Sequence, residues 1–249
     1  MTLILVGVGA SVALGAALQR ISGMGMGLIA APILALLLGP IDGVLVVNVI
    51  AVINAALNTR GMRADIDWKK FAPIAAALIL GVIPGAWMIP RVSTAALQVL
   101  IGVLLIIALS VVTLGKRKVP NVEGVVPSAI AGAVGGFMNT LSGVAGPAIT
   151  VYAQAARWDQ RMYAGTLQPI FLVAGALSFA DKEISGAADI AAIDPAIWVS
   201  TIAGLVVGVI VGKRLAPRVP KERARRIALS LAFLGGLTAL VRGVIGLAS

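Results

Sequence analysis

Hydrophobic positions run almost without interruption along the chain, and the polar breaks between the apolar runs are short. Runs of about 17 to 22 aliphatic residues match the helix length that spans roughly 30 Å of hydrocarbon. They predict membrane-spanning helices at residues 41–58, 70–89, 93–114, 162–180, 196–212 and 226–247. Residues 2–39 and 124–156 each contain a glycine-rich interruption, which predicts a hairpin of two helices with a non-helical tip. The pattern therefore predicts an all-α polytopic membrane protein.

The two glycine-rich breaks belong to a repeat. Ser22 to Gly27 follows Gln19-Arg20-Ile21, and about 120 residues later Ser142 to Gly146 follows Asn139-Thr140-Leu141. Further on in each half, Gly81 to Gly85 corresponds to Gly208 to Gly212 in the same order. We therefore expect a first repeat at residues 1–118 and a second at 119–249, each with a hairpin and three membrane-spanning helices. In an apolar chain, a duplicated unit interrupted by glycine is typical of a secondary transporter.

The distribution of charge predicts that the two repeats are inverted. The formal net charge is +10, and most Lys and Arg residues lie in short loops, which is the positive-inside signal of a membrane protein rather than a sign of nucleic-acid binding. The basic loop at 60–70 corresponds to the acidic loop at 181–195, in which only Lys182 is basic. The sparsely charged turn at 90–93 corresponds to the basic loop at 213–226. Equivalent loops are thus expected on opposite sides, with both termini outside the cytoplasm.

The absence of two residue types narrows the possible chemistry. The chain has no cysteine and no histidine, which excludes thiolate chemistry and removes the commonest metal ligand and proton switch. We expect no cofactor and no metal. A serine-based intramembrane enzyme would need a general base, and none stands out in the predicted spans. The spans also lack the carboxylates usual in proton relays, which favours export of an anion down the membrane potential.

The glycine-rich breaks are the first candidates for substrate binding. Glycine lets backbone N–H groups face a cavity, and a helix N-terminus adds partial positive charge. Hydroxyl donors lie beside both breaks at positions that resemble helix N-caps. The candidates are Ser22, Gly23, Met24, Gly25, Ser142 and Gly143. The alternative is that these glycines only allow close packing or sharp turns.

Polar residues within apolar stretches form a second group of candidates. Arg20 is the one basic residue in 2–39, and it is a candidate for the site if it lies at membrane depth; otherwise it belongs to a cytoplasmic turn. Asn48 and Gln168 occupy matching positions of the two repeats and can donate to an anion or bond helix to helix. Asn139, which matches Gln19, is a candidate for the same two roles.

Tryptophan and arginine residues near the predicted helix ends have other expected roles. The four tryptophans, Trp68, Trp87, Trp158 and Trp198, fit anchors at the membrane interface. Arg157 and Arg161 lie at the expected cytoplasmic side, where they can guide an anion toward the entrance of a transport path.

Several of these segments together resemble one known family. Gly23 to Gly27 with Pro32, the stretch Arg63 to Lys69, the segment Gly81 to Gly85 and the Ser142-Gly143 break are similar to the TauE/SafE family in order and spacing. The resemblance covers nearly the whole chain. It implies a multi-pass protein of the bacterial-type cytoplasmic membrane that exports sulfur-containing anions, such as sulfite, sulfoacetate and related organosulfonates.

The function that we expect is a secondary transporter or exporter of a small sulfur-containing anion, which glycine-rich helix breaks hold near the middle of the membrane. An anion channel that uses the same tips is one alternative, and a non-transporting membrane assembly subunit is another. The expected partners are the small anion and the lipid bilayer. Faces that contact lipid resemble subunit interfaces in composition, so the sequence leaves open whether the chain forms a homodimer.

Overall fold

The structure is a computed structural model that describes residues 1–23, 26–114 and 121–248. Within these residues every regular element is helical, so the prediction of an all-α fold is confirmed. The α-helices are α1 (Thr2–Ser22), α2 (Gly27–Leu38), α3 (Pro40–Gly61), α4 (Trp68–Met88), α5 (Thr94–Leu114), α6 (Val125–Ser142), α7 (Gly146–Ala155), α8 (Gln160–Ile184), α9 (Pro195–Leu215) and α10 (Lys221–Ala248). Short 3-10 turns η1 (Arg63–Asp65), η2 (Ile89–Arg91) and η4 (Ile190–Ala192) lie in three of the connections. Seven of the described helices are long and apolar enough to cross a membrane.

Side-chain caps explain where several helices begin. Asp159 and Asp194 accept hydrogen bonds from backbone N–H groups of the first turns of α8 and α9, and such caps satisfy donors that have no partner within the helix. Helix α8 is longer at both ends than the expected 162–180. It continues past Asp181 to Ile184, and the side chain of Lys182 on this extension is fully buried in the protein instead of lying in a solvated loop.

The first helix of each hairpin ends in the same way. Gly23 after α1 and Gly143 after α6 adopt left-handed conformations, with φ of 77° and 69°. Each glycine donates its backbone N–H at 2.8 Å to a carbonyl four residues earlier, that of Gln19 or that of Asn139. Residues with a side chain rarely adopt this conformation, so glycine at these two positions ends the helix and lets the chain turn back.

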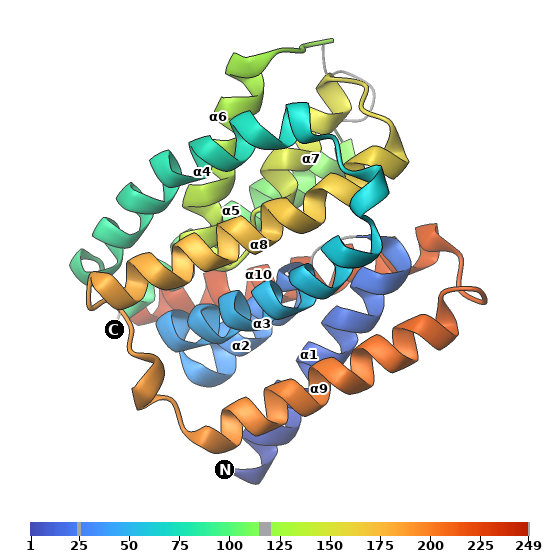
Figure 1. Cartoon of the computed structure of the whole chain (residues 1–249). Coiled ribbons are helices and arrows are strands. Elements are labelled where there is room, and N and C mark those ends of the chain that lie inside the picture. Colours follow the sequence, from blue (N-terminus) through green and yellow to red (C-terminus); the bar gives the residue numbers. More distant parts are fainter. Residues whose placement is uncertain (24–25, 115–120, 249) are drawn as a thin grey trace.

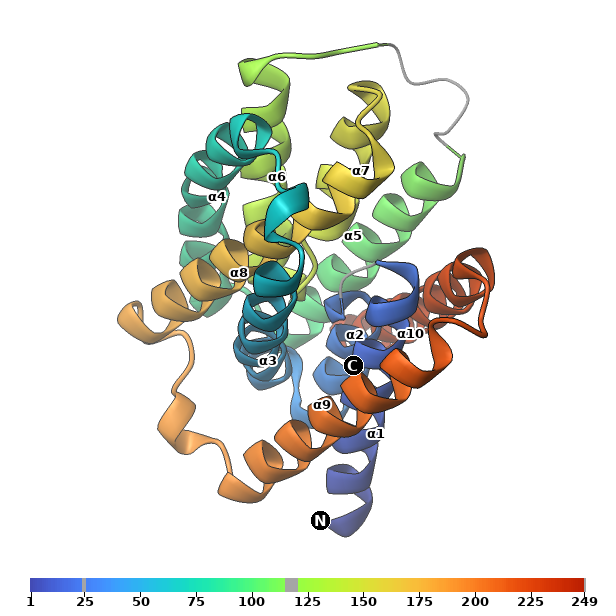
Figure 2. The same cartoon turned by 45° about the vertical axis from the view of Figure 1, so that its right-hand side comes forward.

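The first helix of each half packs against a helix of the other half. Helix α1 packs against α9 on one side of the molecule, and α6 packs against α4 on the other, as Figures 1 and 2 both show. A Cβ on Gly204 would overlap the carbonyl oxygen of Gly9, and one on Gly136 would overlap that of Leu78. Small residues of this kind let membrane helices approach closely. Helices α3 and α8, and α5 and α10, also pair across the halves.

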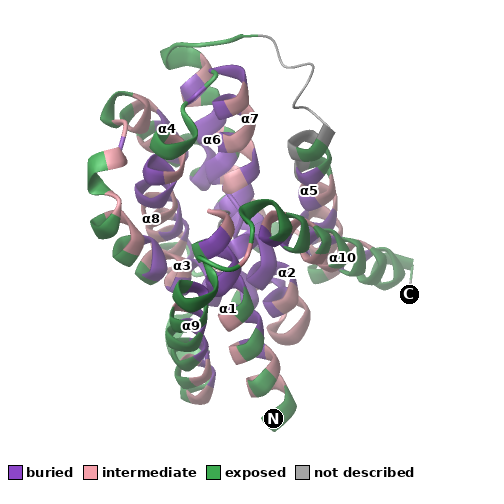
Figure 3. Ribbon diagram, turned by 90° about the vertical axis from the view of Figure 1, so that its right-hand side faces the viewer, coloured by how far each residue is buried: buried purple, intermediate pink, exposed green. Residues whose placement is uncertain are grey.

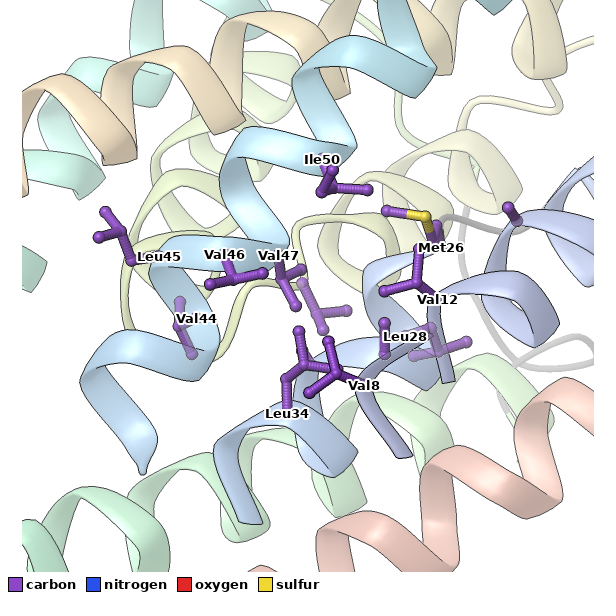
Figure 4. Packing of buried hydrophobic residues seen from close by; sticks show 14 of the residues in the cluster. Val8, Val12, Met26, Leu28, Leu34, Val44, Leu45, Val46, Val47 and Ile50 are labelled. Atoms are coloured by element: carbon purple, nitrogen blue, oxygen red, sulfur yellow. The ribbon is translucent and has the colours of Figure 1, made fainter. Parts of the chain in front are cut away.

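Residues are buried where helices pack together, and the faces that no other helix covers stay exposed although many of their side chains are apolar. Figure 3 shows buried residues gathered around α1, α2, α6 and α7, with exposed residues on the outer faces of α9 and α10. Figure 4 shows part of the largest core cluster, in which Val12, Met26, Leu34 and Val47 of the first hairpin region and α3 pack together. The outer faces carry many exposed large apolar side chains, as expected for helices that contact lipid.

Candidate functional site

The tips of the two hairpins meet inside the bundle. A Cβ on Gly27, the first residue of α2, would overlap the carbonyl oxygen of Gly143, the residue that ends α6. Ala31 and Val47 lie close to Gly143 on the same side, within 3.2 Å of the position that its Cβ would occupy. The tips are therefore in backbone contact, and no side chain fits between them at this point.

A hydrogen-bond network centred on Gln19 holds the first tip. The Gln19 Oε1 atom accepts from the backbone N–H of Met26 at 2.7 Å and from Asn54 Nδ2 at 2.8 Å. Gln19 Nε2 donates to Gln168 Oε1 at 3.1 Å, which connects α1 to α8. All these side chains are buried, so each hydrogen bond replaces one that water would otherwise supply.

A second network, centred on Asn139, holds the second tip. Asn139 Nδ2 lies 2.9 Å from Ser178 Oγ, 3.1 Å from the carbonyl oxygen of Ala174 and 3.2 Å from Asn48 Oδ1. The hydroxyl groups of Thr140 and Ser178 are 3.0 Å apart. The remaining donor of Asn48, its Nδ2 group, is buried and has no hydrogen-bond partner among the described residues.

The two networks use equivalent positions of the two halves. Gln19 corresponds to Asn139, and Gln168 corresponds to Asn48, at the offset of about 120 residues. The contact of Gln19 with Gln168 therefore has its counterpart in the contact of Asn139 with Asn48. At the same offset, the hydrogen bond from Arg20 to Asn58 corresponds to the contact of Thr140 with Ser178. Each hairpin is thus tied to the third helix of both halves.

A cavity of about 580 Å³ adjoins both tips. Its volume lies in the range usual for small-molecule sites. Deep in the bundle it is lined by Gln19, Gly27, Asn139 and Gly143, and along its wall by polar side chains of α7 and α8 and by apolar side chains such as Leu28 and Phe171. Ser22 and Gly23 also line it, close to the start of α10, because the end of α1 packs against Ala224. Its opposite end carries Arg157, Lys221 and Arg225 with one acid, Glu222. This end is therefore basic, and it adjoins the loops that we expect in the cytoplasm.

Two polar atoms in the cavity wall have no partner among the described residues. They are Gln154 Oε1 and Trp158 Nε1, both buried from solvent by the surrounding protein. Edge-to-face contacts with Tyr152 and Tyr163 fix the Trp158 ring, and Lys70 Nζ lies 4.9 Å from its centroid. The N–H is a hydrogen-bond donor, and because it is shielded from the cavity, a bound ligand reaches it only when the surrounding side chains move.

Trp158 does not lie where we expected it. The interpretation of this residue as an anchor at the membrane interface is wrong, because its side chain is 9% exposed and lines the cavity. Trp68 and Trp87 have exposed fractions of 58% and 61%, which fits the expected role of anchors at the membrane interface. Arg157 lines the basic end of the cavity, whereas Arg161 forms an ion pair with Asp65 at 2.8 Å.

The structure brings most of the predicted binding residues together, at different distances from the cavity. Ser22, Gly23, Asn139 and Gly143 line it. Asn48 and Gln168 lie in the networks behind the lining, and Ser142 Oγ is buried and donates to the carbonyl oxygen of Met138 at 2.7 Å.

The other predicted residues lie away from the cavity or outside the described part. Arg20 is exposed, and its Nη1 donates to Asn58 Oδ1 at 3.0 Å. Met24 and Gly25 fall outside the described residues, as do Lys116 to Lys118 of the expected basic connection between the halves.

Sequence reasoning missed Gln19 and Asn54 as organisers of the first tip. Gln19 was recognised as the match of Asn139, and that match was the signal that it belongs with the candidates. Nothing in the order of residues distinguishes Asn54 from a packing residue, because its role depends on the Gln19 oxygen that it meets at 2.8 Å.

Comparison with known proteins gives one match. The family model described as "Sulfite exporter TauE/SafE" matches residues 7–239, which include both glycine-rich breaks and both networks. No curated protein and no solved structure matches the chain. The match spans most of the chain, and it agrees with the multi-pass helical architecture and its apolar outer faces. The chain therefore belongs to the TauE/SafE family, the membrane transporters of the sulfite exporter type, and is a multi-pass protein of the cytoplasmic membrane.

Proposed function

We propose that this protein is a secondary transporter that exports a small sulfur-containing anion, namely sulfite, sulfoacetate or a related organosulfonate. The observation that carries the proposal is the position of the cavity, which adjoins both hairpin tips and has a basic opposite end. Clustered basic side chains at an entrance attract an anion and raise its local concentration. Such an anion would enter among Arg157, Lys221 and Arg225 and reach the tips at the inner end.

The tips supply donors of the kind that an oxyanion needs. The first N–H groups of a helix have no partner within the helix, and the helix dipole adds partial positive charge there. The N-termini of α2 and α7 both adjoin the cavity, at Gly27 and Gly146. We assign the sulfonate or sulfite oxygens to this end. Apolar lining residues such as Leu28 and Phe171 leave room for the carbon chain of an organosulfonate.

The inverted repeats that we propose for this chain would give the site a means of alternating access. A two-fold relation between the halves is supported by the packing of α1 with α9 and of α6 with α4. The matched networks of Gln19 and Asn139 support it as well. In transporters built from inverted repeats, one half rocks against the other around a site near the middle of the membrane. The cavity described here then corresponds to a state open to the cytoplasm.

Contact between the tips favours a carrier over a channel. A channel needs a continuous wet path. Here the backbones of Gly27 and Gly143 touch at the inner end of the cavity, so this path is closed on one side. The membrane potential can drive export, because moving one negative charge outward yields about 2.3 kcal/mol per 100 mV.

The test is transport by purified protein in liposomes. Labelled sulfite, thiosulfate, sulfoacetate and a carboxylate without sulfur are compared, with and without an imposed potential. We expect saturable transport of a sulfur oxyanion, stimulation by the same anion on the opposite side, and little transport of the carboxylate. A rate that rises linearly with concentration, without such stimulation, would indicate a channel. No transport by folded protein would favour the assembly subunit.

The matched control for this test is a pair of asparagine variants. Asn139→Leu removes an amide that lines the cavity and holds the second tip, whereas Asn121→Leu changes an exposed amide outside the helices. We expect the first variant to lose most transport and the second to keep it. Equal losses in both would mean that the transport does not depend on the cavity.

A further inference from the structure

A lysine lies fully buried where the expected loop should be. Lys182, near the end of α8, has an exposed fraction of 0%, and its Nζ atom has no hydrogen-bond partner among the described residues. Burying an ammonium group without a partner costs several kcal/mol. In a membrane protein, an ionisable residue kept at such a cost is a candidate for the transport path.

The position of Lys182 on α8 places it beside the second network. It lies one helical turn after Ser178, the residue that contacts Asn139 and Thr140, and residues four apart share one face of a helix. Long side chains on a helix run back toward the preceding turn, which here is the turn of Ser178. Asn139 contacts both Ser178 and Asn48, so the turn toward which the Lys182 side chain runs also lies beside Asn48, whose Nδ2 is buried and unpartnered.

The neighbouring acid, Asp181, also has a buried atom, Oδ2, without a hydrogen-bond partner among the described residues. Asp181 lines a shallow groove against Ile79, Val82 and Ile83 of α4, and Lys182 does not line this groove. No ion pair joins Asp181 to Lys182 in the described part of the chain, although they are adjacent. No direct contact with Asp181 therefore occupies the Lys182 ammonium group, although the two adjacent charges still attract each other.

This region lies on the far side of the tips from the cavity. The cavity is lined by Asn139 and ends at the tips, whereas Lys182 belongs to the last turn of α8. An apolar cluster lies at this end, with Leu141 in its core and Ile41 and Ala187 packed against it. Ala187 also donates its backbone N–H to the carbonyl oxygen of Lys182 at 2.9 Å. Lys182 is thus enclosed between the second network and an apolar seal on the expected outer side.

We propose that Lys182 forms a second anion-binding position, on the exit half of the transport path, with the Asn48 amide and the Ser178 hydroxyl as neutral donors. This inference rests on the proposed function. When the tips separate, the anion passes from the cavity to Lys182, whose charge repays the desolvation that the anion undergoes there. The apolar seal then opens to release it outside.

The test separates binding in the cavity from passage through the protein. Lys182→Met keeps a long side chain and removes the charge, Lys182→Arg keeps the charge, and Lys213→Met removes an exposed lysine at the end of α9 as the matched control. Sulfite is the probe, with transport measured in liposomes and affinity measured by titration of the solubilised protein. We expect Lys182→Met to lower the transport rate at least 10-fold while affinity changes less than twofold. Lys182→Arg should keep a measurable part of the rate, and Lys213→Met should keep all of it.

Melting temperatures show whether the lysine has a structural role instead. Removal of an unpartnered buried charge should leave the melting temperature of Lys182→Met unchanged or raise it. A lower melting temperature, or transport at more than half the wild-type rate, would overturn the inference and leave the proposed function intact. If the wild-type protein carries another sulfur anion but not sulfite, the same variants are compared with that anion as the probe, and the same outcomes apply. Absence of transport of all of them overturns both proposals.

Discussion

Gly27 and Gly143 lie in direct backbone contact, although they belong to different hairpins and to opposite halves of the chain. The carbonyl oxygen of Gly143 occupies the space that a Cβ on Gly27 would need. This contact closes the inner end of the cavity, and the two polar networks on either side of it fix the tips in place. In the proposed transport cycle, this contact is the point that has to open.

Replacing Gly27 tests the contact directly. A methyl group in Gly27→Ala meets a backbone atom, which cannot rotate away as a side chain can. We expect the free energy of unfolding to fall by about 1–3 kcal/mol, the usual cost of overpacking, and transport to fall at least 10-fold. Gly61→Ala is the control, because a Cβ on Gly61 would meet nothing within 4 Å. If both variants behave like the wild type in melting and transport assays, the tips do not touch as described.

Removal of the Gln19 side chain should loosen the first tip. Gln19→Leu leaves the Met26 N–H, Asn54 Nδ2 and Gln168 Oε1 without their partner. An unsatisfied buried polar group costs about 1–3 kcal/mol, so we expect a lower free energy of unfolding and slower transport.

A double-mutant cycle isolates the contact between the halves. Gln19→Leu and Gln168→Leu, made singly and together, should show a coupling of about 0.6 kcal/mol, the average for polar side chains between membrane helices. The melting and transport of the three variants provide the measurement. Strictly additive effects would show that the 3.1 Å contact between Gln19 and Gln168 does not link α1 to α8 in solution.

The indole N–H of Trp158 provides a prediction about substrate binding. Trp158→Phe keeps an aromatic ring between Tyr152 and Tyr163 but removes the unpartnered donor from the cavity wall. Loss of one hydrogen bond to an anion is worth about 1.5 kcal/mol, so KM for the transported anion should rise roughly 10-fold with little change in maximal rate. Trp87→Phe, at an exposed position, is the control. An unchanged KM in Trp158→Phe would exclude this group from the binding site.

The sequence predicts much of this architecture because membrane helices and helix breaks are encoded locally. Apolar runs of spanning length predict the helices, and glycine-rich breaks predict where the chain turns. In the structure, Gly23 and Gly143 adopt the left-handed conformation at these breaks. Asn48 and Gln168 were recognised as an equivalent pair from their offset alone. Each, however, bonds to the hairpin of the other half, and the order of residues does not say which helices pack across the halves.

Two further residues show the limit of local reasoning. Trp158 and Lys182 both lie near helix ends, where an aromatic ring or a charge is normally exposed to the interface or to water. In the fold their side chains are 9% and 0% exposed. Aromatic neighbours pack against Trp158, and the surrounding protein buries Lys182 completely, so the burial of both side chains depends on tertiary contacts.

The expected inversion of the repeats can be tested by labelling, because the wild-type chain has no cysteine that would react in the background. Ala64→Cys and Ser185→Cys lie in equivalent exposed loops, and so do Ser93→Cys and Arg218→Cys. In intact cells, a membrane-impermeant maleimide should label Ser185→Cys and Ser93→Cys. It should label Ala64→Cys and Arg218→Cys only after the membrane is opened. If the two members of either pair react from the same side, the repeats are parallel and the alternating-access scheme based on inversion fails.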